Sequence, residues 1–97
     1  MQDYHEPHEK LSKETKDYIR ALTSMKEEIE AVDWYQQRMD ATKDKQLKKI
    51  LKHNRDEEME HAAMTLEWLR RQLPELGEEL KSYLFTPGSI TGAEKAE

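Results

Sequence analysis

The sequence predicts an all-α fold, an antiparallel two-helix hairpin plus a short C-terminal helix, with two hairpins dimerising into a four-helix bundle. All three prolines and all three glycines lie outside residues 8–73, so this span contains no strong helix breaker. Apolar residues repeat every seven positions in its first half, as they do in packed helices. With 97 residues, 38% of them charged, one hairpin buries only a thin core, and self-association is therefore expected.

The first helix is expected to run from about residue 11 to the polar stretch DATKDK at residues 40–45. Ser12 or Thr15 is suited to begin it, because a side-chain hydroxyl accepts a hydrogen bond from a free N–H of the first turn. Thr42 is suited in the same way to cap the following helix. The packing stripe of the first helix consists of Leu11, Tyr18, Met25, Val32 and Met39, with Leu22 and Ile29 at the intervening steps.

The second helix carries a stripe in which apolar residues lead into a polar pair, Glu58 and His61, and follow it. The stripe comprises Leu47, Ile50, Leu51, Asn54, Glu58, His61, Thr65 and Trp68, and continues with Leu69. Past Pro74, the segment PELGEELKSYLF is expected to form one or two further helical turns. We expect a flexible N-terminus at residues 1–10, a helical hairpin domain at 11–86 and a tail at 87–97.

Glu58 and His61 are unusual on a buried stripe, because charged groups are costly to bury without partners. Three positions apart on a helix, their side chains can reach one metal ion. Ferritin-like bundles hold half of a dinuclear centre with this Glu-x-x-His spacing and a further glutamate from a neighbouring helix. The alternative is a solvated face, or a Glu–His hydrogen bond on a bundle surface.

The remaining carboxylate is expected on the first helix, on the flank that meets the second. Glu28 directly precedes Ile29 of the stripe, and Tyr35 follows seven residues later on the same flank. Glu14 and Glu27 compete with Glu28, but Glu14 lies near the helix start and Glu27 points further from the stripe. Tyr35 either packs in the core or donates a hydrogen bond to a liganding carboxylate.

Counting these ligands predicts a site shared between two chains. Each chain offers Glu28, Glu58 and His61, whereas a ferritin-like dinuclear site requires two such sets. Two hairpins related by a two-fold axis would bring together four carboxylates and two imidazoles, whose charge balances two divalent ions.

Composition excludes several other classes of function. The absence of cysteine excludes disulfides, thiolate metal sites and thiol catalysis. A net charge of −5 argues against nucleic acid as a partner, because such binding depends on Lys and Arg at phosphates. No apolar run is long enough for a membrane, and the polar start MQDYHEPHEK lacks the apolar segment of a signal peptide. The expected compartment is the cytoplasm.

Three stretches in order, MKEEIEAVDWYQQRMD, HNRDEEMEHAAMTLEWLRR and SYLFTPGSIT, closely resemble the encapsulated ferritins, small two-helix relatives of ferritin carried inside prokaryotic encapsulin shells. The resemblance runs from about Leu11 to the end of the chain. It implies ferroxidase ligands at Glu28, Glu58 and His61, the residues that spacing also selects.

The resemblance also implies a route for iron and an assembly. Acidic residues that take up metal before it reaches the centre would be Glu27 and Glu30, with Trp34 close by and Tyr35 beside the ligands. Both glutamates would also be ordinary on a solvated face, and Trp34 would suit an oligomer contact. Family members form a ring of five dimers. Their apolar C-terminal targeting peptide has no counterpart at GAEKAE, so association with a shell rests on resemblance alone.

We therefore expect a ferroxidase that oxidises Fe(II) with O2 at two iron ions per dimer, feeding iron storage inside an encapsulin nanocompartment. One alternative is a structural hairpin in which Glu58 and His61 bind zinc or nothing. Another is a dinuclear manganese or iron site that reduces oxygen or peroxide, because ligand type alone does not separate these metals. His5 and His8 could hold a stray metal, although a disordered terminus is expected there.

Overall fold

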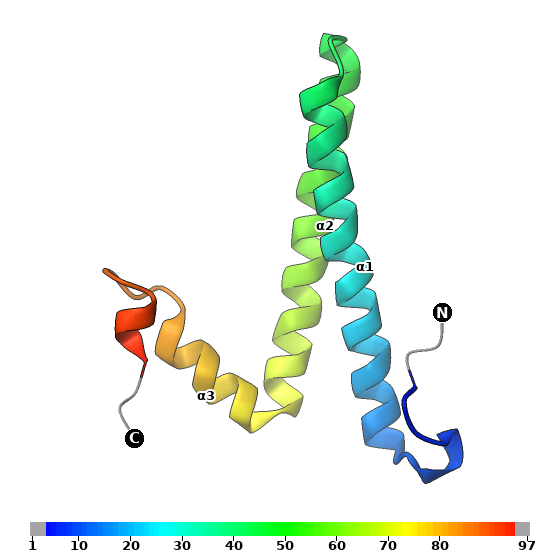
Figure 1. The fold of residues 1–97 in the computed structure, drawn as a ribbon, viewed down its shortest axis with the longest axis vertical. Coiled ribbons are helices and arrows are strands. Elements are labelled where there is room, and N and C mark those ends of the chain that lie inside the picture. The colour runs from blue at the N-terminus through cyan, green and yellow to red at the C-terminus, as the bar shows by residue number, and fades with distance from the viewer. Residues whose placement is uncertain (1–3, 95–97) are drawn as a thin grey trace.

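The computed structural model describes residues 4–94 and is all-helical over that range, which confirms the predicted fold class. Helix α1 spans Lys13–Ala41, α2 spans Lys45–Gln72 and α3 spans Pro74–Tyr83, with single 3₁₀ turns at His8–Lys10 and Thr91–Ala93. Helices α1 and α2 run antiparallel side by side, and α3 leaves the open end of this hairpin at an angle (Figure 1). None of the helices within residues 4–94 is long and apolar enough to cross a membrane.

The two long helices begin at side-chain caps. Ser12 accepts a hydrogen bond from the Thr15 N–H at 3.1 Å, as expected for one of the two candidate residues. The prediction for α2 is wrong, because Asp44 and not Thr42 caps it, accepting from the Leu47 N–H at 2.8 Å. Asp44 directly precedes the first helical residue, and its negative charge suits the positive end of the helix dipole. The Thr42 hydroxyl instead accepts from the Asp44 N–H at 3.2 Å.

Pro74 separates α2 from α3. Its missing N–H is tolerated at the first position of α3, where that group would have no partner inside the helix. The residue before it, Leu73, is extended and closes α2 by donating its N–H to the Leu69 carbonyl at 2.9 Å.

The core of the single chain is thin, as its size predicts. Three hydrophobic side chains of the described residues are buried, Met39 and Leu51 near the loop and Leu69 near the open end. Leu22 and Ile29 do not fill the stripe as predicted, since they are 43% and 55% exposed. Half-buried Ala21, Glu28 and Tyr35 take the intervening positions instead. Neighbouring residues point about 100° apart on a helix, so a shift of one position moves a side chain off the interface.

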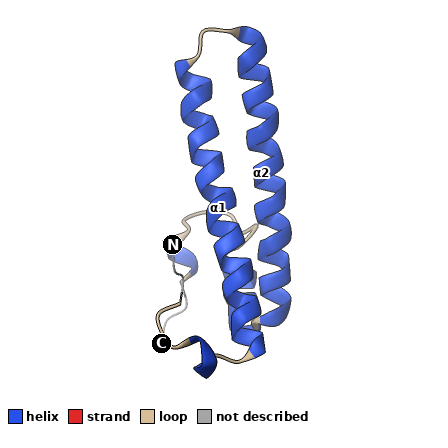
Figure 2. Ribbon diagram, turned by 90° about the vertical axis from the view of Figure 1, so that its right-hand side faces the viewer, coloured by secondary structure: helices blue, strands red, loops and turns tan. Residues whose placement is uncertain are grey.

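A single hairpin leaves many large apolar side chains in water. Figure 2 shows α1 and α2 lying side by side, and Figure 1 shows α3 turning away from them. The exposed apolar residues on these helices are Leu22, Ile29, Trp34, Leu47, Ile50, Met59, Met64 and Trp68. A surface of this kind marks an interaction site in a water-soluble domain.

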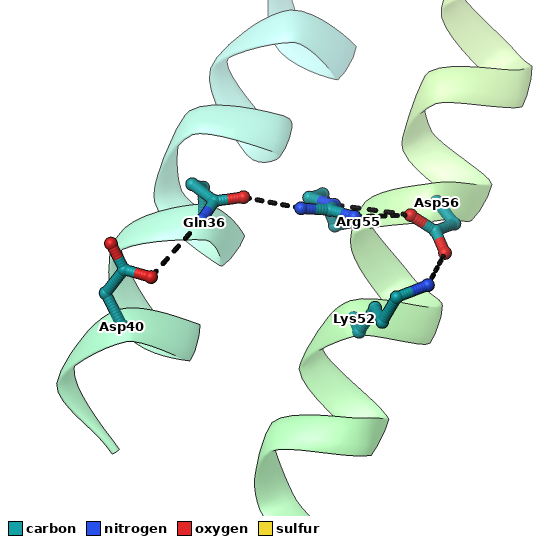
Figure 3. A network of polar contacts seen from close by, with 5 residues as sticks. All are labelled: Gln36, Asp40, Lys52, Arg55 and Asp56. Carbon is teal, nitrogen blue, oxygen red and sulfur yellow. Dashed lines mark hydrogen bonds and ion pairs between the residues drawn. The ribbon is translucent and has the colours of Figure 1, made fainter.

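A polar network joins α1 to α2 near the loop (Figure 3). The Arg55 guanidinium donates to the Gln36 side-chain oxygen across the two helices and to Asp56 on its own helix. Lys52 donates to Asp56 at 2.8 Å, and this hydrogen bond, together with that from Arg55, lowers the pKa of the Asp56 carboxyl. Gln36 in turn donates to Asp40 at 3.3 Å. The network links the helices close to their connection.

Candidate metal centre

The predicted ligands lie in the middle of the α1–α2 interface, between the buried side chains of its two ends. Glu28 on α1 and Glu58 and His61 on α2 are half-buried, as is Tyr35. The Glu58 side chain is 26% exposed and that of His61 43% exposed. These side chains are therefore partly shielded by the two helices and partly exposed to solvent.

Glu58 and His61 point the same way from α2. The Glu58 Oε1 lies 3.7 Å from the His61 Nδ1, which is too long for a hydrogen bond and close enough for two ligands of one ion. One turn of helix thus presents a carboxylate and an imidazole together, as their spacing predicts.

A hydroxyl connects Glu28 to the next turn of α2. The Thr65 Oγ1 lies 3.3 Å from the Glu28 Oε1 and 3.1 Å from the backbone carbonyl oxygen of His61. Thr65 was expected only as a member of the α2 stripe, and its contact with Glu28 was not foreseen. The feature of the sequence that could have indicated this contact is the position of Thr65, seven residues after Glu58 and four after His61 on the same side of α2. This contact holds the α1 carboxylate one helical turn beyond His61.

The three predicted ligands do not converge on one point within a single chain. Within residues 4–94, no group of three or more His, Asp or Glu side chains is close enough to hold a metal ion. Their chemistry nevertheless fits iron, which carboxylate oxygens and imidazole nitrogens bind well. Each chain supplies donor atoms of the right kind, with Glu28 held beside Thr65 and the other two on the preceding turns of α2.

The other predicted residues lie on α1 within about two helical turns of Glu28. The Tyr35 ring faces the Arg38 guanidinium, whose carbon is 5.4 Å from the ring centroid. A hydrogen bond from Tyr35 to a liganding carboxylate stays a prediction. Glu27, Glu30 and Trp34 are exposed, and Trp34 is 49% exposed.

The competing and terminal candidates are exposed as well. Glu14 lies in the first turn of α1 with its side chain in solvent. His5 is exposed, and the His8 ring stacks on Tyr4 with the ring centroids 5.4 Å apart.

A surface groove of about 510 Å³ begins beside the candidate centre. Met64, Thr65 and Trp68 line it from α2, and Asp17 and Ser24 are among the residues that line it from α1. The Trp68 ring is tilted against Tyr18 at a centroid distance of 6.3 Å. The groove beside Thr65 is therefore lined by both apolar and polar side chains.

Known proteins match nearly the whole chain. The sequence profile of the family described as EncFtn-like matches residues 3–87. A ferritin-like protein of Thermotoga maritima is 60% identical over 92 residues, covering 95% of this chain and 81% of that protein. An encapsulated ferritin-like protein of Rhodospirillum rubrum is 59% identical over 93 residues, covering 96% of this chain and 66% of the relative. A Nitrosomonas europaea protein solved by crystallography superposes with a TM-score of 0.89 at 60% identity, covering 92% of this chain and 98% of that one.

Proposed function

The chain belongs to the EncFtn-like family of ferritin-like proteins, as its motifs predict, and from this we propose that it is a ferroxidase. It oxidises Fe(II) to Fe(III) with O2 at a di-iron centre shared across a two-fold dimer interface. The observation that most directly supports this proposal is the Glu28–Thr65 contact, which holds a carboxylate of α1 at the turn of α2 that follows His61.

The shared centre is supported by the exposed apolar side chains of the hairpin. Ile29 and Met59, next in sequence to Glu28 and Glu58, are 55% and 47% exposed. Pairing two hairpins would cover this surface and supply a second set of ligands. Four carboxylates would then carry a charge of about −4, which two divalent ions balance.

The chemistry needs little from the protein beyond binding and orientation. Carboxylates of Glu28 and Glu58 bind iron in both oxidation states, and the neutral His61 imidazole supplies a nitrogen ligand. Each Fe(II) substrate ion gives one electron to O2. In this proposal Tyr35 donates a hydrogen bond to a liganding carboxylate and steadies it.

The exposed residues near the centre are assigned to iron uptake and assembly. Glu27 and Glu30 attract Fe(II) from solution, because exposed carboxylates raise the local concentration of cations. Trp34 lies at a contact between chains. As in the resembled family, five dimers form a ring.

We extend the proposal to an encapsulin shell in the cytoplasm because the Rhodospirillum rubrum relative is described as encapsulated. This chain spans about two thirds of that relative's length. The ring of small chains oxidises iron, and the surrounding compartment stores the product.

Oxygen consumption after addition of Fe(II) at controlled pH tests the proposal. We expect His61→Ala and Glu58→Ala to lower the rate by more than about 100-fold, since even partners of metal ligands contribute about 10- to 100-fold. Glu14→Ala is the matched control and should retain the parent rate, because Glu14 is exposed in the first turn of α1.

Circular dichroism should show the same helix content in all these proteins. Parent-like oxidation by either ligand variant would refute the assigned site. Loss of activity in Glu14→Ala would restore Glu14 as the α1 ligand.

A further inference from the structure

We propose that Thr65 is a positioning residue, whose hydroxyl orients the Glu28 carboxylate for binding Fe(II). This inference rests on the proposed function, because it assumes that Glu28 is a ligand. It is carried by a single side chain that contacts both helices of the hairpin.

The Thr65 hydroxyl has one proton and two acceptors within reach. The Glu28 Oε1 is 3.3 Å away and the His61 carbonyl oxygen 3.1 Å away. Donation to a carbonyl four residues earlier is a common resting position for a threonine inside a helix. Glu28 is 37 residues away along the chain, so donation to it links α1 to α2. The proton is therefore shared between a contact within α2 and one between the helices.

The position of this proton decides whether the Glu28 carboxylate is free to rotate or held in one orientation. When the hydroxyl donates to the His61 carbonyl, the Glu28 carboxylate is free to turn about its side-chain bonds. When the hydroxyl donates to Oε1, that oxygen is held and the carboxylate is restricted in its rotation. A hydrogen bond to a charged carboxylate is stronger than one to a neutral carbonyl, especially at a half-buried site. Ionised Glu28 therefore favours the oriented state.

Orientation of the Glu28 carboxylate should affect the binding of Fe(II) more than the rate of its oxidation. A ligand already directed at the ion loses less conformational entropy when it binds. Outer partners of metal ligands typically contribute about 10- to 100-fold in metal affinity. Removing the hydroxyl should thus weaken binding and raise the KM for Fe(II), with a smaller change in kcat.

Three substitutions separate the hydroxyl from the shape of the side chain. Thr65→Val removes the hydroxyl and keeps the branched shape, whereas Thr65→Ser keeps the hydroxyl. Ser82→Ala is a matched control, because the Ser82 hydroxyl donates to the Glu78 carbonyl at 3.1 Å, the same contact four residues back in α3. Thr65→Ala provides a second removal of the hydroxyl if the valine disturbs folding.

Equilibrium dialysis of anaerobic Fe(II) against the full-length chain measures the effect without turnover. We expect about 10-fold weaker binding for Thr65→Val, near-parent binding for Thr65→Ser, and unchanged binding for Ser82→Ala. Steady-state oxidation should show the matching rise in KM. His61→Ala, included in the same series, reports whether the assigned site binds iron at all.

Two results would overturn the inference, and they differ from each other. If His61→Ala weakens binding while Thr65→Val and Thr65→Ala bind as the parent does, the centre stands and the role of Thr65 is wrong. If the parent and His61→Ala bind Fe(II) alike, the proposed centre is wrong and Thr65 has no ligand to orient.

Discussion

The ends and the middle of the α1–α2 interface are built from different side chains. Met39 and Leu51 are buried near the loop and Leu69 near the open end. Between them lie Glu28 and Glu58, half-buried and charged. The ends hold the helices together through apolar burial, whereas the middle places charged side chains, the proposed cation ligands, at the interface. In the proposed function, stability and metal binding therefore depend on separate parts of one interface.

The largest effect on stability is expected at an apolar end. Leu69 is 0% exposed, so Leu69→Ala should lower the free energy of unfolding by about 2–5 kcal/mol through lost burial and an unfilled cavity. Phe85→Ala is the control, because Phe85 is 102% exposed and should change stability by less than about 0.5 kcal/mol. Urea unfolding at one fixed protein concentration measures both. Equal losses in the two variants would contradict the assignment of Leu69 to the core.

In the middle of the α1–α2 interface, we expect a substitution to raise stability instead of lowering it. Glu58→Met replaces a half-buried carboxylate with an apolar side chain and should raise the stability of the metal-free protein by about 0.5–2 kcal/mol while abolishing oxidation. Glu60→Met, at an exposed position of the same helix, should leave stability nearly unchanged. Urea unfolding in the presence of a chelator provides the comparison. A Glu58→Met protein less stable than the parent would show that the carboxylate supports the fold without metal.

The smallest effect is expected at the exposed surface of α2. Glu67 accepts hydrogen bonds from Arg70 and Arg71, and these lower the pKa of its carboxyl from 4.5 to about 2. A depressed pKa in the folded state means that the contribution is present above about pH 4.5 and is lost as the pH falls toward 2. Solvent screening keeps it small.

Glu67→Gln should therefore show a slightly shallower loss of stability between pH 4.5 and 2 than the parent, measured by thermal unfolding across that range. A steeper acid dependence in the variant would contradict the assigned sign.

Periodicity and breaker residues predicted the helices and the start of α3 at Pro74, and Ser12 was one of two candidate caps for α1. They did not separate Leu22 from Ala21 or Ile29 from Glu28, because adjacent positions both fall near a broad apolar stripe. Asp44 and Thr42 are both good caps, and the residue at which α2 begins decides between them.

The residues of the candidate site are predictions from the sequence, whereas their contacts come from the structure. The spacing of Glu58 and His61 is a property of one helix and can be read from the sequence. The Thr65–Glu28 contact depends on how α1 and α2 are aligned, which local patterns do not specify. The shared centre itself depends on a second chain and stays a prediction.

The central claim is that two chains share one centre, and sedimentation of anaerobic protein with and without Fe(II) tests it most directly. If both chains supply ligands, Fe(II) binds the associated state preferentially and stabilises it by mass action. At a concentration where the metal-free chain is partly dissociated, analytical ultracentrifugation should show a shift toward larger assemblies on adding Fe(II). Glu28→Ala should weaken that shift. Identical sedimentation of the parent in both conditions would contradict the shared centre and favour a structural hairpin.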